Sequence, residues 1–178
     1  NFTPFILPKK AVFQLCNLLQ EAKGDIKLSS SESKIQFEID KTKIITKIID
    51  GKFPDYKKVV PKNNNKILKV NTKEFIHSVE RVITVSIDRK EGVKIAIKKD
   101  QIQLFVNSSS SGEGKETLSA NYNAENLTIS FNSRYLLDIA SEIEDENIIM
   151  NLNDSVSPVL IQDNSDKHSY YVIMPMKI

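Results

Sequence analysis

Side chains that commonly carry out catalysis are few in this sequence. Its two histidines are His77, in a predicted helix, and His168, in a predicted loop beside a strand. Neither has a serine, cysteine or second histidine at the spacing of a nucleophile elbow or a zinc-ligand pair. The single cysteine, Cys16, lies beside the apolar face of a predicted helix, and we expect it to be a small buried side chain. The sequence therefore offers no recognisable nucleophile and base.

Two other patterns resemble functional motifs only in part. Gly112-Glu113-Gly114 is too short for a phosphate-binding loop and lacks its Lys-Ser/Thr ending, so we interpret residues 108–114 as a flexible loop. Four acidic residues gather near the end of a predicted helix, where a solvated terminus is a simpler reading than acid–base catalysis: Glu142, Glu144, Asp145 and Glu146. We expect no active site, no metal site and no cofactor.

The composition is that of an ordinary globular protein. The chain has 178 residues, 40% hydrophobic and 27% charged, and a formal net charge of +2. This weak positive charge neither requires nor excludes a nucleic-acid partner. One cysteine and no apolar run of about 20 residues favour a cytoplasmic protein without a membrane span. Because the sequence opens on Asn1 without a methionine, we expect a piece of a longer protein.

The predicted helices and strands, which must position any functional site, occur in the same order three times. A helix with Pro8 at its first position and Gly24 just beyond its end precedes strands at 26–28, 34–39 and 42–49. A strand at 67–70, an N-cap at Asn71 and a helical stripe from Phe75 to Ile83 precede strands at 93–98, 102–106 and 117–122. A strand at 127–131 and a helix with apolar residues from Tyr135 to Ile143, capped by Asn132 or Ser133, precede strands at 147–152, 156–162 and 169–174.

This order predicts an α+β fold made of repeated β-α-β-β-β units with a period of roughly 60 residues. One helix covers only a small part of a sheet, so a single unit cannot close its core. The second and third units can pair into one domain, and the first is left without a partner. Residues 50–62 hold Gly51, Pro54 and Pro61, which interrupt regular structure, and we expect an ordered crossing whose apolar side chains pack: Phe53, Tyr56, Val59 and Val60.

Two surface features could bind a partner. Basic residues near the helix starts could meet phosphates if the helices line one surface: Lys9, Lys10, Lys73, Arg81 and Arg134. Solvated helix faces explain them equally well, because acidic residues such as Glu80, Asp138 and Glu142 dilute the positive charge. The C-terminus stays apolar through Met174, Met176 and Ile178, which suits either an adaptable apolar groove or a terminal strand docked in the core.

Four motifs, in this order, resemble those of the bacterial DNA polymerase III beta subunit, the sliding clamp. They are DGKFPDY at 50–56, FNSRYLLD at 131–138, DSVSPV at 154–159 and YVIMPMKI at 171–178. The resemblance covers the whole chain. It implies that residues 1–56 are the second half of the clamp middle domain and residues 57–178 the third domain. It also implies the DNA-clamp fold, with antiparallel sheets outside and helices on the inner face of a ring around duplex DNA.

The family resemblance further implies a function and its sites. Such clamps are homodimeric, non-catalytic and cytoplasmic, and bind short peptides of the DNA polymerase III alpha subunit, the clamp loader and repair proteins. The matching pocket positions are Pro54, Lys58, Val59, Asn132, Tyr135, Val156, Pro158, Val172, Ile173, Met174, Pro175 and Met176. Thr84 and Val85 match the dimer interface, and the basic residues named above would face DNA. A piece lacking the upstream domains should neither complete the pocket nor close the ring.

Two other functions remain as alternatives. An unrelated hydrolase or transferase would need a nucleophile–base pair, which the residues do not supply. A module that binds DNA directly, without a ring, would show steeply salt-dependent affinity, because released counterions dominate such binding.

Overall fold

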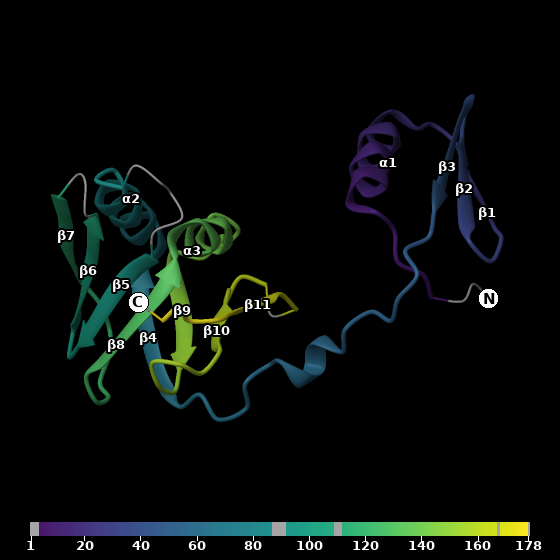
Figure 1. Cartoon of the computed structure of the whole chain (residues 1–178). Helices are drawn as coiled ribbons and strands as arrows, with labels where there is room; N and C mark the ends of the chain where they lie inside the picture. The colour runs from purple at the N-terminus through teal and green to yellow at the C-terminus, as the bar shows by residue number, and fades with distance from the viewer. Residues whose placement is uncertain (1–3, 87–91, 109–111, 167, 178) are drawn as a thin grey trace. The chain divides into compact units, whose positions relative to one another are not determined.

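The computed structural model describes residues 4–86, 92–108, 112–166 and 168–177 (Figure 1). The chain divides into two compact units, an N-terminal unit of Asn1–Asp55 and a C-terminal unit of Tyr56–Ile178. The α+β class and the repeated β-α-β-β-β order are confirmed, with antiparallel pairing throughout the three sheets. Among the helices of the described residues, none has the length and apolar content needed to cross a bilayer.

The N-terminal unit is one helix on a three-stranded sheet. Helix α1 (Lys9–Glu21) is followed by β1 (Ile26–Ser30), β2 (Lys34–Ile39) and β3 (Thr42–Lys47), in the sheet order β1-β2-β3. The alternation of Ile35, Phe37 and Ile39 points these side chains toward α1, where they form a small core with Leu15.

Several details of this unit differ from the sequence prediction. Pro8 is the N-cap residue of α1 and not its first helical residue, and α1 ends at Glu21 with Ala22 as its C-cap, so Gly24 does not terminate it. Strand β3 ends at Lys47, and Ile49 instead forms an isolated antiparallel bridge with Ile6. The prediction of a buried Cys16 is wrong, since the structure exposes this thiol.

The connecting segment contains one short 3₁₀ turn, η1 (Tyr56–Lys58). Phe53, Tyr56 and Val59 are all more than half exposed, so the prediction that they pack is wrong, and only Val60 is half-buried. The prolines on either side prevent the segment from joining a sheet that could cover these side chains.

The C-terminal unit contains the β-α-β-β-β order twice. Its first half is β4 (Lys66–Asn71), α2 (Thr72–Ile83), β5 (Gly92–Lys98), β6 (Gln101–Ser108) and β7 (Gly112–Ser119). Its second half is β8 (Leu127–Asn132), α3 (Ser133–Ala140), β9 (Asn147–Leu152), β10 (Val159–Gln162) and β11 (Tyr170–Ile173).

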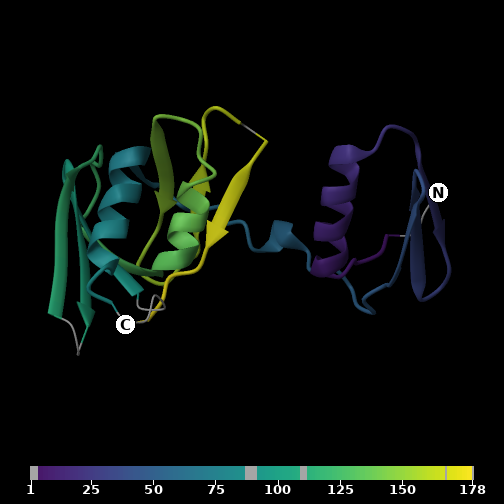
Figure 2. The same ribbon diagram turned by 90° about the horizontal axis from the view of Figure 1, so that it is seen from above.

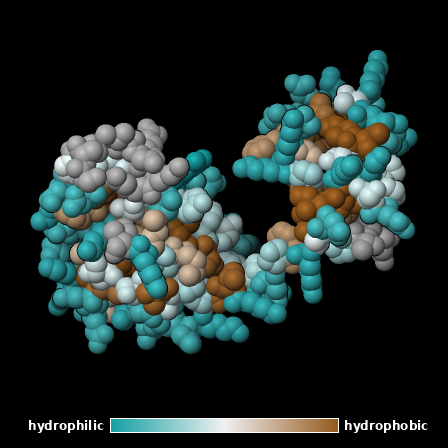
Figure 3. Space-filling view, viewed as in Figure 1, coloured by the Kyte–Doolittle hydropathy of each residue, from teal (hydrophilic) through white to brown (hydrophobic). Residues whose placement is uncertain are grey.

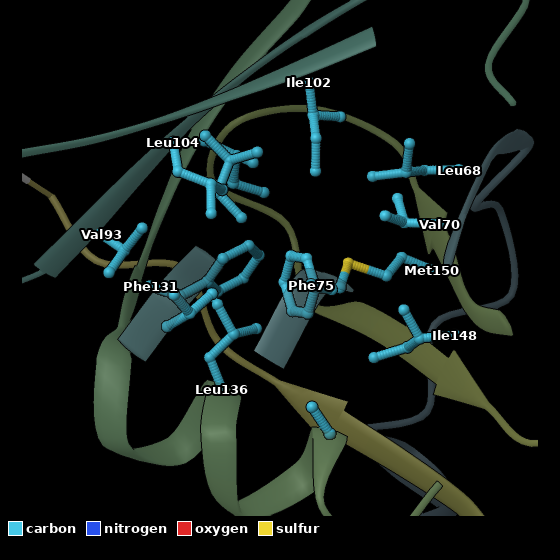
Figure 4. Close-up of a cluster of buried hydrophobic side chains, with 14 of the residues drawn as sticks. Leu68, Val70, Phe75, Val93, Ile102, Leu104, Phe131, Leu136, Ile148 and Met150 are labelled. Atoms are coloured by element: carbon cyan, nitrogen blue, oxygen red, sulfur yellow. The ribbon is translucent and has the colours of Figure 1, made fainter. Parts of the chain in front are cut away.

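The two halves exchange their first strands. The sheet orders are β11-β10-β9-β4 and β7-β6-β5-β8, so β4 joins the strands of the second half and β8 joins those of the first. Helices α2 and α3 lie side by side between the two sheets (Figures 1 and 2). Figure 4 shows Phe75 of α2 near the centre of the shared core, among side chains from both sheets such as Leu68 and Phe131.

Local signals set most of these boundaries. Asn71 caps α2 by accepting the Glu74 N–H at 3.1 Å, and Asn132 caps α3, as predicted. Lys99 and Asp100 form the tight turn between β5 and β6, where Asp100 takes a positive φ of 58°. Strand β10 starts at Val159 and not at Val156, because Asp154 accepts the N–H groups of Val156 and Ser157 in a turn.

The predicted flexible loop at 108–114 is largely strand. Ser108 ends β6 and pairs with Gly112 at the start of β7, while residues 109–111 lie outside the described residues. The predicted strand at 117–122 is the second part of this longer element, which ends at Ser119. Gly114 is required by close packing, because a Cβ there would lie 2.6 Å from the carbonyl oxygen of Val82, whereas Gly112 has a positive φ of 103°.

This close approach predicts that Gly114→Ala destabilises the C-terminal unit. The added methyl meets backbone that cannot move aside cheaply, so we expect the free energy of unfolding to fall by about 1–3 kcal/mol, the usual cost of overpacking. Urea denaturation measures this loss. The neighbouring Glu113→Ala, at an exposed position of the same strand, should change stability little, and equal stability of the two variants would contradict the packing argument.

Candidate functional site

The apolar C-terminal segment joins the edges of the two sheets. Strand β11 ends at Ile173, and the chain then leaves its sheet. The Met176 N–H donates to the carbonyl oxygen of Ser130 on β8 at 2.7 Å. Because β11 and β8 are edge strands of different sheets, residues 174–176 span the gap between these two edges. We call residues 174–177 the tail.

One pocket lies between the tail and α3. Its volume is about 650 Å³, and Met174 and Tyr135, exposed by 61% and 60%, contribute apolar surface to it. We call it the helix-side pocket; its lining residues are Asn132, Tyr135, Asp138, Ile139, Val172, Ile173, Met174, Pro175 and Met176.

The start of α3 determines which side chains reach this pocket. The Asn132 side-chain oxygen accepts the N–H groups of Arg134 and Tyr135 at 3.0 and 3.3 Å, which fixes the first turn of the helix. Tyr135 and Ile139 are four residues apart and therefore lie on one face of α3, where both line the pocket.

A second pocket lies where the connecting segment meets β11. Its volume is about 610 Å³, and we call it the linker-side pocket; its lining residues are Lys58, Val59, Val60, Pro61, Lys62, Asn63, Asn64, Asn153, Ser157, Pro158, Val172 and Met174. The side-chain amide of Asn64 donates to the carbonyl oxygens of Asn151 and Pro158, each at 2.8 Å. These two hydrogen bonds connect the segment before β4 to β9 and to the loop before β10.

Val172 and Met174 line both pockets and form the wall between them. The two pockets thus make one interrupted apolar surface, with a few polar groups at its rim. Such surfaces bind the apolar side chains of a ligand and orient it through a small number of hydrogen bonds. The flexible thioether of Met174 can adjust to different apolar side chains on either side. Apolar residues are exposed on the surfaces of both units (Figure 3).

Two carboxylates shape the loops beside this surface. Hydrogen bonds from the Val156 N–H and from the hydroxyl and N–H of Ser157 lower the pKa of Asp154, which holds the turn ahead of Pro158. Asp163 follows β10 and is buried. The Ser165 hydroxyl, at 2.6 Å, lowers the pKa of Asp163, and the Glu144 N–H, at 2.7 Å, adds to this effect.

The structure gathers most of the predicted pocket residues. Seven line the helix-side pocket and five line the linker-side pocket, with Val172 and Met174 counted in both. Val156 lines neither pocket and is largely exposed. Pro54 lies in the N-terminal unit and also lines neither. Sequence reasoning missed Asp138 and Ile139, although the four-residue spacing from Tyr135 was a usable signal for Ile139. It also missed Asn64, for which the sequence carries no signal.

The predicted basic residues are all exposed, but most have close neighbours. Arg81 makes a bidentate contact with Glu116, from Nε at 2.8 Å and from Nη2 at 3.1 Å. The hydrogen bond from Arg81 is also the main cause of a lowered pKa of Glu116. Arg134 Nε lies 4.0 Å from the Asp138 carboxylate, and Lys9 Nζ lies 5.4 Å from the centre of the Phe13 ring.

Helices α2 and α3 carry no excess of positive charge. Their cations are Lys73, Arg81 and Arg134, and their anions are Glu74, Glu80 and Asp138. In α1, Lys9 and Lys10 exceed the single Glu21. A surface of this kind contacts phosphates weakly, because each cation on α2 and α3 is matched by an anion on the same pair of helices.

Thr84 and Val85, which the family resemblance assigns to the dimer interface, lie at the end of α2. Thr84 is the C-cap residue and is exposed, and its N–H and hydroxyl both donate to the Arg81 carbonyl oxygen. Val85 is half-buried against the core.

Comparison with known proteins identifies the family of the chain. Residues 57–177 match the family described as "DNA polymerase III beta subunit, C-terminal domain", and residues 2–55 match its central domain. The chain belongs to the DNA polymerase III beta subunit family. It is 34% identical over 173 residues to the beta sliding clamp of Caulobacter vibrioides, and 30% identical to that of Escherichia coli K12. These matches cover 97% of this chain but 46% and 47% of the two relatives.

Solved structures of the family have the same fold. The DnaN sliding clamp of Bartonella birtlesii bound to griselimycin matches with a TM-score of 0.90 and 42% identity, over 99% of this chain and 48% of that one. The Caulobacter crescentus pol III beta structure matches with a TM-score of 0.92 and 33% identity, over 100% and 48%. The chain therefore spans about half the length of these beta subunits.

The lowered pKa values of Asp154 and Asp163 predict that the C-terminal unit loses stability in acid. Asp163 and Asp154 have folded pKa values below the unfolded value of about 3.9, so their stabilisation is complete above that value. It is lost as the pH falls through the lowered folded pKa values. We expect Asp163→Asn to lower stability at neutral pH and to flatten its fall below about pH 4.

Urea titrations at a series of pH values measure this dependence. The reference is the unaltered chain, titrated in the same way. An unchanged profile for Asp163→Asn would contradict the role assigned to its hydrogen bonds.

Proposed function

We propose that this chain forms part of a sliding clamp that encircles duplex DNA as a homodimeric ring and tethers other proteins to it. In this proposal residues 1–56 belong to the middle domain and residues 57–178 form the third domain. The protein is not an enzyme and acts in the cytoplasm. Its partners are the DNA polymerase III alpha subunit, the clamp loader and other proteins that carry a clamp-binding peptide. Membership of the beta subunit family supports this proposal.

The observation that carries the peptide-binding role is the interrupted apolar surface around Met174. Two neighbouring pockets share Val172 and Met174, which suits a short peptide with two apolar anchors. The polar rim, with Asn132 on one side and Asn64 on the other, lies within the same C-terminal unit. Pro54 and Val156 line neither pocket. They would belong to the binding site only if the site extends beyond both pockets.

Tethering does not need strong contact with DNA. Encirclement keeps a bound polymerase close to its template by raising its effective concentration. The balanced charges on α2 and α3 suit this role, because strong phosphate contacts would resist sliding. Lys9, Lys10, Lys73, Arg81 and Arg134 are the proposed DNA-facing residues, and Thr84 and Val85 the proposed ring contact.

Fluorescence polarisation of a labelled Gln-Leu-x-Leu-Phe peptide tests the peptide site. We expect saturable binding that weakens at least about tenfold in Met174→Ala, because truncation at the centre of an interface typically costs more than ~1 kcal/mol and 1.4 kcal/mol is a factor of ten. Tyr135→Ala should weaken binding from the helix side. Because both side chains are more than half exposed, neither variant should unfold the protein.

The matched control is Ile67→Ala on β4, where the side chain is exposed to a similar degree but lines neither pocket. Binding that is lost equally in Ile67→Ala and Met174→Ala would contradict the assignment. Absence of binding to the unaltered chain would contradict a site confined to the C-terminal unit.

Salt dependence separates a clamp from a module that binds DNA directly. We expect affinity of this chain for a linear duplex to be barely measurable and to change little between about 50 and 200 mM salt. A direct binder that neutralises several phosphates would instead show a slope of about −0.9 per phosphate in log K against log salt. Polarisation of a labelled duplex measures this slope, and a steep value that falls in Lys9→Gln/Lys10→Gln would favour the direct-binding function.

A further inference from the structure

The sheet β7-β6-β5-β8 packs one face on the helices and turns the other face away from them. Figure 2 shows α2 and α3 on the same side of this sheet. Val93, Ile95 and Ile97 of β5 are buried in the core, so the alternate residues of β5 point outward. We call this outward side the outer face of the sheet. Its charged residues are Lys94 and Lys98 on β5 and Glu113 and Lys115 on β7.

An aromatic side chain lies between two of these lysines. Phe105 of β6 is the direct cross-strand neighbour of Lys94 and of Lys115. Such neighbours have Cβ atoms about 4.5–5.5 Å apart, so a ligand that contacts the ring lies within reach of both ammonium groups. Phe105 is half-buried, and both lysines are exposed. Among the described residues only Lys9 lies over a phenylalanine ring, that of Phe13, so neither neighbouring lysine covers the ring of Phe105.

The positive charge of the outer face is not neutralised by contacts. Within the part of the chain that the structure describes, none of its three lysines forms an ion pair. They also outnumber the single Glu113. The arginines of the helices differ, because Arg81 contacts Glu116 and Arg134 lies near Asp138. The outer face, and not the surface of α2 and α3, therefore carries uncompensated positive charge.

The rest of the outer face beside these lysines is small or uncharged. Between Lys94 and Lys98, the only side chain that β5 points outward is that of Ala96. Across from Ala96, the Gln103 amide donates to the Thr117 hydroxyl at 3.3 Å. The two lysines are four residues apart, which is roughly 13 Å along a strand. An extended anionic chain can therefore lie along β5 with a cation at each end.

We propose that the outer face binds single-stranded DNA. One base stacks on the ring of Phe105, and Lys94, Lys98 and Lys115 contact phosphates around it. Antiparallel sheets that combine aromatic side chains with cations bind single strands in this way, because every base has a π-face and every nucleotide carries a phosphate. A polyanion without bases would use the lysines and leave the ring unused. The choice of DNA over RNA rests on the proposed function, in which the protein works on DNA.

This site is distinct from the proposed contact with duplex DNA. A duplex keeps its bases stacked on one another, so it cannot place a base on Phe105. The outer face should therefore prefer a single strand to a duplex. The helix residues that are proposed to face duplex DNA take no part in this site.

Fluorescence polarisation of a labelled oligothymidylate tests the site in the whole chain. We expect saturable binding that weakens as salt is added. Phe105→Leu keeps an apolar side chain but removes the ring, and should raise the dissociation constant about fivefold or more, the smaller end of the effect of losing one stacked base. Lys94→Gln should make the slope of log K against log salt shallower by about 0.7, the value for one phosphate contact with a single strand.

The matched control is Lys47→Gln, which removes the same charge from an exposed position of β3 in the other unit. It should bind as the unaltered chain does. Circular dichroism checks the fold of each variant, and Lys94→Gln still tests the site if Phe105→Leu does not fold.

Several results would overturn the proposal. They are absence of binding, equal affinity for a duplex, and equal weakening by Lys47→Gln and Lys94→Gln. Undiminished binding by a folded Phe105→Leu would also overturn it, because charge alone would then explain the affinity. Tighter binding of an oligouridylate would overturn the choice of DNA.

Peptide binding separates a failure of this proposal from a failure of the proposed function. Phe105 lines neither the helix-side nor the linker-side pocket, so Phe105→Leu should bind the Gln-Leu-x-Leu-Phe peptide as the unaltered chain does. A chain that binds this peptide but no oligothymidylate would overturn only the site on the outer face.

Discussion

The structure depends on one constraint: a single amphipathic helix cannot cover a four-stranded sheet. In the C-terminal unit the two β-α-β-β-β halves solve this by exchanging β4 and β8, so that each sheet contains strands of both halves and α2 packs beside α3. The exchange makes one core out of two incomplete ones. Thr72 at the start of α2 also donates from its hydroxyl to the Asp145 carbonyl oxygen ahead of β9, which ties the halves together at a second place. Neither half can keep its buried residues without the other.

The candidate binding surface is a consequence of this arrangement. Because β8 and β11 are the edges of different sheets, the tail that leaves β11 reaches β8 beside the start of α3. The tail therefore lies over the face of α3 that carries Tyr135 and Ile139, and Met174 becomes the wall between two pockets. Ile173, the last residue of β11, belongs to the core, whereas Met174 just beyond it is 61% exposed. The candidate binding surface thus lies beside the contact through which the tail joins the two sheets.

Local patterns were enough to predict the elements, and contacts between distant elements were not predictable. The caps at Asn71 and Asn132 and the alternation of residues 34–39 gave the correct element types, since each depends on neighbours in sequence. The start of β7 at Gly112 was missed, because glycines usually indicate a loop, and the need for Gly114 comes from the Val82 backbone of another element. The motif resemblance named most of the tail and helix residues that line the two pockets, and only tertiary structure shows why Asn64 lies with them.

Cys16 shows how the same pattern has different outcomes. It lies beside the apolar stripe of α1 and was predicted to be buried, but its thiol is exposed, whereas Val79 of α2 and Ala140 of α3 are buried. Whether the thiol is in fact buried depends on a second half-domain, which no local pattern describes. In the C-terminal unit that half lies on the same chain, and for the N-terminal unit it has to come from outside the unit. Because burial of this stripe removes several apolar side chains from water at once, covering it is strongly favourable wherever a complementary half is at hand. Burial of a residue in such a repeat is therefore a property of the pair of halves and not of either sequence alone.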